Sequence, residues 1–191
     1  MDNYYNFSKR LIDFLISFFL LILFCPFMLI IGALIKFTSK GSVTYLQERV
    51  GLNGKVFRLY KFRTMIQNAE KDTGPVWAKH NDSRVTGLGR IMRRLRIDEI
   101  PQLINVLKGD MSIVGPRPER PYFVHQHKAL QGLRLSVKPG LTGLAQVEGY
   151  YHTTPRNKLR YDKVYIENRS LTLDVKLMLK TMIVVFTRKG S

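Results

Sequence analysis

Two adjacent carboxylates, Asp98 and Glu99, are the first residues of the sequence whose types and surroundings suggest chemistry. They lie in the stretch RRLRIDEIPQ, residues 93–102, directly after three arginines. Arginine binds phosphate bidentately, and an ionised carboxylate is a nucleophile. The two acids therefore either neutralise the basic stretch or act on the same anionic substrate as the arginines.

The residues that follow this pair predict a helix that ends at Gly109, with apolar positions at Ile100, Leu103, Ile104 and Leu107. Pro101 fits only in the first turn of such a helix, which predicts Asp98 as the N-cap. Glu99 would then be a favourable first-turn acid. A capping role is sufficient to explain Asp98. However, a helix N-terminus that follows arginines also binds phosphate and keeps a carboxylate ionised, so a nucleophilic role stays open.

A second group of arginines lies in the proline-rich stretch GDMSIVGPRPERP, residues 109–121. Prolines restrict the backbone on both sides of Arg117 and Arg120, so these side chains are expected to project from a stiff loop. A guanidinium held in place suits bidentate phosphate recognition. The alternative is a proline-rich turn whose arginines are simply solvated.

The elements that must position these residues begin with a β-hairpin over residues 41–65. Asn53-Gly54 is a strong hairpin signal, and alternating apolar residues flank it. The second strand runs into the basic stretch from Lys61 to Arg63, which is either a solvated strand end or part of a phosphate site. Residues 82–97 have helical apolar spacing with arginines between, which predicts a basic amphipathic helix suited to a membrane surface, RNA or solvent.

Residues 138–149, KPGLTGLAQVEG, predict a turn followed by a short strand or a closely approaching loop. They contain no GxGxxG fingerprint within a βαβ unit, so a dinucleotide-binding fold is not expected. The four histidines are at 80, 125, 127 and 152, and only His125 and His127 are spaced like metal ligands, so zinc is not expected. Two helices are predicted at 156–168 and 171–187, the second with a broad apolar face that fits an interfacial helix or a core helix.

Residues 11–35 form an apolar run that is long enough to span a bilayer. The run is too long for the apolar part of a signal peptide, and no cleavage pattern follows it. Pro26 predicts a break or kink in the middle, and basic residues flank both ends. Because basic flanks favour the cytoplasmic side, a helix that enters one leaflet and returns fits better than a simple span.

The composition limits the class of protein. The chain has 191 residues, a net charge of +17 and 45% apolar residues, which predicts one ordinary domain with a membrane segment and an anionic partner. That partner is nucleic acid, an anionic membrane surface or a phosphorylated substrate. Cys25 is the single cysteine, so a disulfide framework is excluded.

Taken together, these segments resemble the monotopic phosphoglycosyl transferases of bacteria, within the bacterial sugar transferase family. The resemblance covers nearly the whole chain and rests on the apolar segment with Pro26, QERVG (47–51), KFRTM (61–65), DEIPQLINVLKGDMSIVGPRPE (98–119) and PGLTGLAQV (139–147). It implies an α+β fold. A re-entrant membrane helix broken at Pro26 (1–40) would precede a cytoplasmic, membrane-surface-associated catalytic domain (41–191). That domain would contain a small β-hairpin and mainly α-helices, with interfacial amphipathic helices.

The resemblance also implies a reaction. On the cytoplasmic face of the bacterial inner membrane, the aspartate of the Asp-Glu pair attacks the β-phosphate of a UDP-sugar with magnesium assisting. UMP leaves, and polyprenyl phosphate then attacks the covalent phosphosugar intermediate. Membrane lipids would be further partners, nucleic acid would not, and homo-oligomerisation stays open.

By this resemblance Asp98 would be the nucleophile and a magnesium contact. Glu99 would position the metal or deprotonate the lipid phosphate. Arg93 and Arg117 match phosphate-binding positions of the family. Further candidates for substrate or phosphate binding are Lys61, Arg63, Arg120, Gln146 and Arg156.

Two positions depart from the family pattern. Cys25 precedes Pro26 where relatives often have serine, whose hydroxyl satisfies a freed carbonyl better than a thiol does. After AQV the chain has Glu148, Gly149 and Tyr150 in place of an Asn-Gly-Arg-like run, so we expect Arg156 or Lys158 to replace the missing arginine. A membrane-anchored nucleic-acid binder and a non-catalytic scaffold are the alternative functions; the sequence does not identify the sugar.

Overall fold

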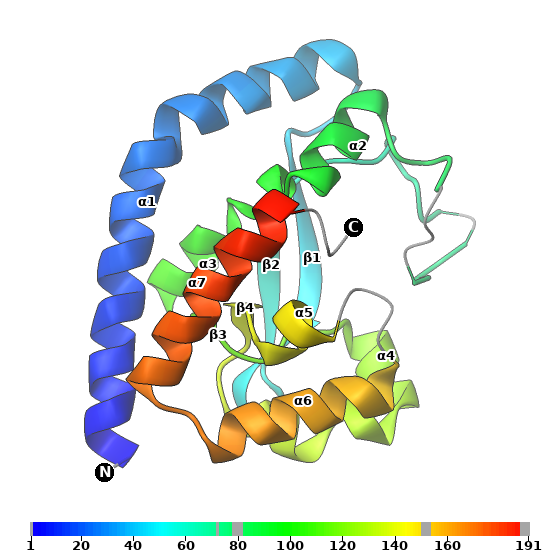
Figure 1. Cartoon of the computed structure of the whole chain (residues 1–191). Helices are drawn as coiled ribbons and strands as arrows, with labels where there is room; N and C mark the ends of the chain where they lie inside the picture. Colours follow the sequence, from blue (N-terminus) through cyan, green and yellow to red (C-terminus); the bar gives the residue numbers. More distant parts are fainter. Residues whose placement is uncertain (1, 72, 78–81, 150–153, 188–191) are drawn as a thin grey trace.

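The computed structural model describes residues 2–71, 73–77, 82–149 and 154–187 (Figure 1). Its helices are α1 Asp2–Thr38, α2 Gly87–Arg94, α3 Gln102–Lys108, α4 Pro121–Gln126, α5 Leu144–Glu148, α6 Pro155–Glu167 and α7 Leu171–Thr187. Its strands are β1 Thr44–Val50, β2 Val56–Phe62, β3 Ser112–Val114 and β4 Gly140–Thr142. This mixture of helices with small sheets and one long apolar N-terminal helix confirms the predicted α+β class.

The predicted hairpin is confirmed. β1 and β2 pair antiparallel, with Val50 opposite Val56 and Thr44 opposite Phe62. Asn53 and Gly54 adopt positive φ angles of 54° and 79° in the connection, a conformation that asparagine and glycine accept most readily. The hairpin therefore carries its second strand directly to Lys61 and beyond.

The second sheet is a short parallel pair that brings the proline-rich segment against residues 139–143. Gly115 N donates to Thr142 O over 2.8 Å, and Gly140 N donates to Pro116 O over 2.9 Å. A Cβ atom on Gly140 would lie only 2.1 Å from Gly115 N. Glycine is required here because any side chain would push the two backbones apart. The close approach predicted for this loop is confirmed.

Helix α1 is long and apolar enough to cross a membrane, judged by its length and composition. A break or kink was predicted at Pro26, and the chain remains α-helical through this residue, so the helix is not interrupted there. Figure 1 shows instead that the helix changes direction: its first part runs along one side of the molecule and its last part turns across the top. Large apolar side chains are exposed along it, among them Phe19, Ile22, Leu29 and Ile30.

Both parts of α1 pack against the rest of the chain. Near its start, the Arg10 guanidinium donates to the carbonyls of Val106 and Leu107, the last turn of α3, over 2.6 and 2.7 Å. Near its end, Ile31 and Ile35 are buried in one cluster with Phe62 of β2 and Met92 of α2. Both the first and the last part of the helix therefore contact the same folded domain.

Helix α7 has two apolar faces. Leu177 is buried in the main core with Val106, Val114 and Tyr165, which confirms a core role for one face. The other face exposes Val175, Leu179, Met182 and Ile183. The sequence alone had left the choice between core and interface open, and the broad apolar stripe serves the core on only one side.

Candidate active site

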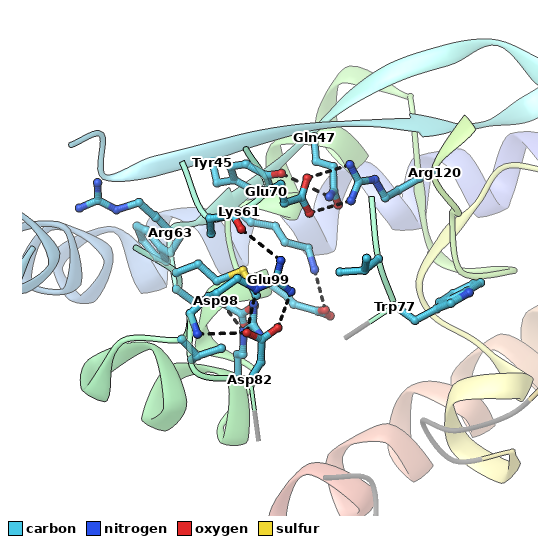
Figure 2. Close-up of a pocket in the computed structure, with 18 of the residues that line it drawn as sticks. Tyr45, Gln47, Lys61, Arg63, Glu70, Trp77, Asp82, Asp98, Glu99 and Arg120 are labelled. Carbon is cyan, nitrogen blue, oxygen red and sulfur yellow. Dashed lines mark hydrogen bonds and ion pairs between the residues drawn. The ribbon is translucent and has the colours of Figure 1, made fainter. Parts of the chain in front are cut away.

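The acid pair lies in a cavity of about 1800 Å³ between the hairpin, α2, the proline-rich loop and the start of α6 (Figure 2). Asp98, Glu99, Lys61, Arg93 and Arg117 all line it. Residues that are far apart in the chain meet there: Lys61 contacts Glu99, 38 positions away, and Glu70 contacts Arg120, 50 positions away. The structure thus brings together acids and bases that the sequence places on separate elements.

The prediction that Asp98 caps a helix is wrong. Arg96 adopts a left-handed conformation with φ 59° and opens a short 3₁₀ turn, Ile97–Glu99, before α3 begins at Gln102. The residue at the N-cap of α3 is Pro101, which makes no side-chain cap. Because the chain turns sharply at Arg96, a 3₁₀ turn forms before α3. Asp98 lies inside this 3₁₀ turn, so its carboxylate does not cap α3.

Asp98 is only 7% exposed. Burial raises the pKa of its carboxyl from 3.8 to about 6, against the opposing charges of Lys61, Arg93 and Arg117. Within the described part of the chain, no side chain forms an ion pair or hydrogen bond with this carboxylate. Asp98 is therefore a buried acid whose oxygens are available to a ligand.

Glu99 is held on both sides. Lys61 Nζ lies 3.0 Å from Glu99 Oε1, and the Arg117 guanidinium binds both carboxylate oxygens, with Nη1 to Oε2 at 3.3 Å. Burial alone would raise the pKa of Glu99, but the charges of Arg117 and Lys61 outweigh it and hold the pKa well below its usual range. Burial also lowers the pKa of the Lys61 ammonium, and the Glu99 charge partly offsets this effect.

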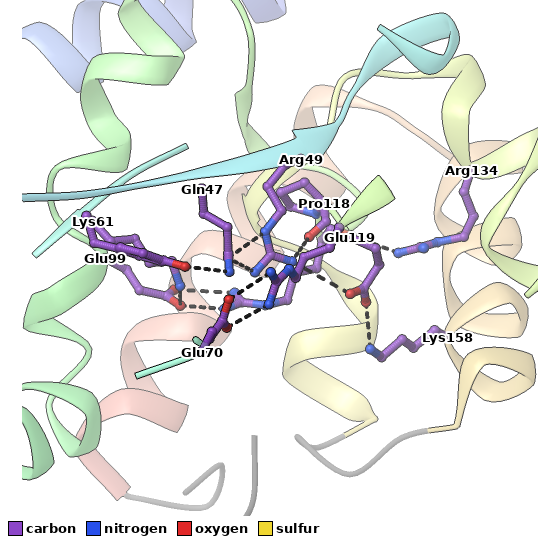
Figure 3. Close-up of polar contacts among 12 residues, drawn as sticks. Gln47, Arg49, Lys61, Glu70, Glu99, Pro118, Glu119, Arg134 and Lys158 are labelled. Atoms are coloured by element: carbon purple, nitrogen blue, oxygen red, sulfur yellow. Dashed lines mark hydrogen bonds and ion pairs between the residues drawn. The ribbon is translucent and has the colours of Figure 1, made fainter. Parts of the chain in front are cut away.

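The loop that carries Arg117 is fixed through its backbone carbonyls (Figure 3). Arg134 Nη2 donates to Arg117 O, and Arg49 Nη1 donates to Pro118 O, each over 2.9 Å. Arg134 is itself clamped by Asp162, with Nε to Oδ2 at 2.5 Å, and both side chains are fully buried. The stiffness predicted from prolines thus has a second source, the buried Arg134 and the half-buried Arg49.

Arg134 and Asp162 were not predicted as site residues, and no local sequence pattern marks them. Glu119 was also missed as a site residue: it accepts from Lys158 Nζ over 2.6 Å and lies 3.8 Å from Arg49. Arg49 and Glu119 stand in the stretches QERVG and GPRPE, so their motifs were the available signal.

The remaining predicted site residues differ in their placement. Arg93 Nε donates to Thr64 Oγ1 over 2.9 Å, beside the acid pair. Arg120 lines the cavity but is bound bidentately by Glu70 at 2.7 and 2.9 Å. Gln146 also lines the cavity, and its buried amide nitrogen and oxygen find no hydrogen-bond partner among the described residues.

Arg63 and Arg156 are placed differently from the others. Arg63 reaches the cavity wall, but its guanidinium donates to Ser39 O and Ser39 Oγ at 2.9 and 2.8 Å, at the end of α1. Arg156 is exposed and outside the cavity lining, whereas Lys158 is part of that lining. Of the two substitutes considered for the missing arginine, Lys158 is therefore the one that faces the acid pair's cavity.

Cys25 is exposed on α1 and, with Pro26, lies outside the cavity lining. The departure from the family pattern at Tyr150 and two histidines, 80 and 152, fall outside the described residues. Over the described ranges, no three His, Cys, Asp or Glu side chains gather as a metal site. The acid pair is thus a two-carboxylate site.

Comparison with known protein families shows what this chain is related to. Residues 4–188 match the model of the bacterial sugar transferases. The chain belongs to the bacterial sugar transferase family. One relative, the UDP-N-acetylgalactosamine-undecaprenyl-phosphate N-acetylgalactosaminephosphotransferase of Aeromonas hydrophila, is 46% identical over 98% of this chain. The UDP-glucose:undecaprenyl-phosphate glucose-1-phosphate transferase of Klebsiella pneumoniae is 41% identical over 96%.

This sugar transferase chain spans 45% and 41% of the length of those two relatives. A shorter relative, the exopolysaccharide production protein ExoY of Rhizobium meliloti, is 36% identical, and the match covers 96% of this chain and 88% of ExoY. The similarity therefore includes a protein of nearly the same extent.

Proposed function

We propose that this chain transfers a sugar 1-phosphate from a UDP-sugar to polyprenyl phosphate, which releases UMP and forms a polyprenyl diphosphate-sugar. The observation that carries the proposal is the buried Asp98 carboxylate, which no described side chain binds and which lies among Lys61, Arg93 and Arg117. The names of the relatives, which act on UDP-sugars and undecaprenyl phosphate, support the substrate classes. The product would begin the assembly of a polysaccharide or glycoconjugate.

In the first step an Asp98 oxygen attacks the β-phosphorus of the UDP-sugar. A new P–O bond forms to Asp98, the bond to the bridging oxygen breaks, and UMP leaves with that electron pair. In the second step an oxygen of polyprenyl phosphate attacks the same phosphorus and displaces the Asp98 oxygen, which restores the carboxylate. Two steps suit a soluble donor and a membrane-bound acceptor that arrive from different phases.

Charge neutralisation is the main task of the surrounding residues, since phosphoryl transfer depends mostly on positioning and electrostatics. Arg117 and Lys61 face the acid pair and would bind the diphosphate of the UDP-sugar by donating hydrogen bonds to its oxygens. Glu99 has a strongly lowered pKa, so it is a poor proton acceptor. We therefore assign Glu99 to orienting Arg117 and Lys61 and to the metal, rather than to deprotonation of the acceptor.

A magnesium ion fits this site, because it usually takes one or two carboxylates and completes its shell with water and substrate phosphate oxygens. Asp98, with no protein partner in the described structure, and its neighbour Glu99 would hold it. When bound, magnesium supplies additional positive charge to the phosphates.

We infer that α1 is re-entrant and that Pro26, which lacks the helical N–H, causes its change of direction. The contacts of Arg10 and Arg63 at its two ends support this, because they place both ends against one domain. The exposed apolar face of α7 would lie in the membrane interface. The active site would then face the cytoplasm at the surface of the bacterial inner membrane.

The function is tested by UMP release from a panel of UDP-sugars, with undecaprenyl phosphate and magnesium, in detergent micelles. We expect release with at least one sugar, a loss of more than about a thousandfold in Asp98→Asn, and a comparable loss on chelation of magnesium. Lys163→Gln, a change at an exposed side chain of α6, serves as the control and should keep full activity. Unimpaired transfer by Asp98→Asn would contradict the proposal.

A further inference from the structure

The outer surface of α2 combines exposed apolar side chains with arginines. Ile91 and Leu95, one helical turn apart, are 57% and 43% exposed, and both line the cavity that holds Asp98. Ile66, 53% exposed, lines the same cavity; its backbone N donates to Arg84 O, just before α2. We call Ile66, Ile91 and Leu95 the α2 surface.

Three guanidinium groups accompany this surface. Arg90, Arg93 and Arg94 line the cavity, and none of them forms an ion pair with the described residues. Arg93 also lines the cavity that holds the acid pair, and its Nε donates to Thr64 Oγ1 over 2.9 Å. Exposed apolar side chains next to unpaired cations match a ligand that has both a hydrocarbon part and a phosphate.

The opposite face of α2 connects this surface to the long apolar helix. Met92 is 1% exposed and packs with Ile31 and Ile35 of α1, and Leu88 packs against the same cluster. The α2 surface is therefore attached to the part of α1 that turns across the top of the molecule, above α2 in Figure 1. A lipid that leaves the membrane beside α1 would meet α2 before it meets Asp98.

We propose that the α2 surface binds the isoprenoid units next to the phosphate of the lipid acceptor, while Arg90 and Arg93 bind that phosphate. This inference rests on the proposed function and divides its cavity into two parts. The donor is less suited to this part, because its hydroxyl-rich sugar and ribose would gain nothing by covering Ile66, Ile91 and Leu95. An isoprenoid chain gains by covering the same side chains.

The test uses the double variant Ile91→Gln/Leu95→Gln. Both positions are exposed, and glutamine keeps helix propensity, so the fold should persist. Two half-reactions are measured in detergent micelles: transfer of radiolabelled sugar phosphate from the UDP-sugar to the protein without acceptor, and discharge of this label by undecaprenyl phosphate. A short-chain analogue, farnesyl phosphate, is compared as a second acceptor.

We expect labelling of the protein to be unchanged and the KM for undecaprenyl phosphate to rise about tenfold or more, from the loss of apolar contact. The matched control is Val164→Gln on α6, where the apolar side chain is 48% exposed and outside the cavity. Its acceptor KM in micelles should equal that of the unchanged protein. Arg90→Gln should raise the KM for both acceptors, because both carry the phosphate.

Three results would overturn the inference. The first is an unchanged acceptor KM in the double variant, and the second is a raised KM for the UDP-sugar. The third is loss of flotation with phosphatidylglycerol vesicles while micellar kinetics stay normal, which would assign the surface to the bilayer. Failure of the unchanged protein to take up label from any UDP-sugar would instead refute the proposed function, so the two failures are distinguishable.

Discussion

Asp98 and Glu99 are neighbours in the chain, yet the protein shifts the pKa values of their carboxyl groups in opposite directions. Asp98 is buried and no described basic side chain binds it, so burial raises its pKa to about 6. Arg117 and Lys61 bind Glu99 and hold its pKa well below its usual value. At neutral pH both are ionised, but only Asp98 has oxygens that no described side chain binds. At the scale of residues, this asymmetry supports the proposed roles, with Asp98 as the reacting carboxylate and Glu99 as the positioning one.

The raised Asp98 pKa predicts the pH dependence of the first half-reaction. A protonated carboxyl is not a nucleophile, so labelling of the protein by UDP-sugar should fall about tenfold per pH unit below about pH 6. The rate is measured as kcat/KM, at UDP-sugar concentrations well below KM and at a constant, subsaturating magnesium concentration, because kcat/KM reports the pKa of the free protein. A rate that stays flat down to about pH 5 would contradict the role of Asp98.

Thermal unfolding distinguishes this effect from acid unfolding. Because the pKa of Asp98 is higher in the folded protein than in the unfolded chain, its contribution favours folding at low pH and is lost as pH rises from 3.8 to about 6. Glu99 has the opposite sign, and its stabilising contribution is lost only as pH falls below 4.5. A decline in rate near pH 6 without a lower melting temperature therefore reports Asp98 ionisation.

At the scale of elements, α6 reaches the active site through a chain of contacts. Asp162 binds Arg134, and Arg134 donates to the backbone carbonyl of Arg117. The Arg117 guanidinium is thus positioned from both ends, by Glu99 at its tip and by Arg134 at its backbone. Arg134 and Asp162 are positioning residues in this arrangement.

Asp162→Asn should lower kcat/KM for the UDP-sugar by about 10- to 100-fold and lower the melting temperature, because it leaves a buried arginine without its counter-charge. The matched control is Glu167→Gln on the same helix, whose pair with Lys163 is exposed and which should change neither quantity. Replacing the pair with Arg134→Met/Asp162→Leu should restore stability but not activity, since Arg117 O then has lost the Arg134 donor. Recovery of both would show a purely structural role.

At the scale of the whole molecule, the long apolar helix is anchored twice to one domain. Arg10 binds the end of α3, and Arg63 binds the end of α1 itself. A straight helix of 37 residues would be about 55 Å long, so its two ends would reach one small domain only with difficulty. The change of direction in Figure 1 removes this conflict and supports a re-entrant arrangement.

Cysteine labelling tests this topology. In a Cys25→Ser background, single cysteines introduced by Tyr4→Cys and Ser42→Cys lie at exposed positions on either side of the apolar run. Both should react with a membrane-impermeant maleimide in inside-out vesicles, and neither should react in intact spheroplasts. Labelling of the two positions from opposite sides would establish a spanning helix.

Several features followed from sequence because they depend on local backbone preferences. Asn53-Gly54 accepts positive φ angles and therefore turned the hairpin where expected, and Gly109 ended α3 for the same reason. Helical spacing located α2, α6 and α7, and the motif 98–119 carried the family assignment. These signals need only a few consecutive residues.

Tertiary structure decided the rest, because it depends on which distant side chains are buried together. Local rules made Asp98 a cap, whereas the left-handed turn at Arg96 moved it into the cavity. Equally basic residues also separated: Arg63 turned to the end of α1, Arg156 to solvent, and Lys158 to the site. Residue type and spacing indicated an anionic partner and the family, and only packing determined which charges surround the buried Asp98 carboxylate, since electrostatic energy depends on distance and burial.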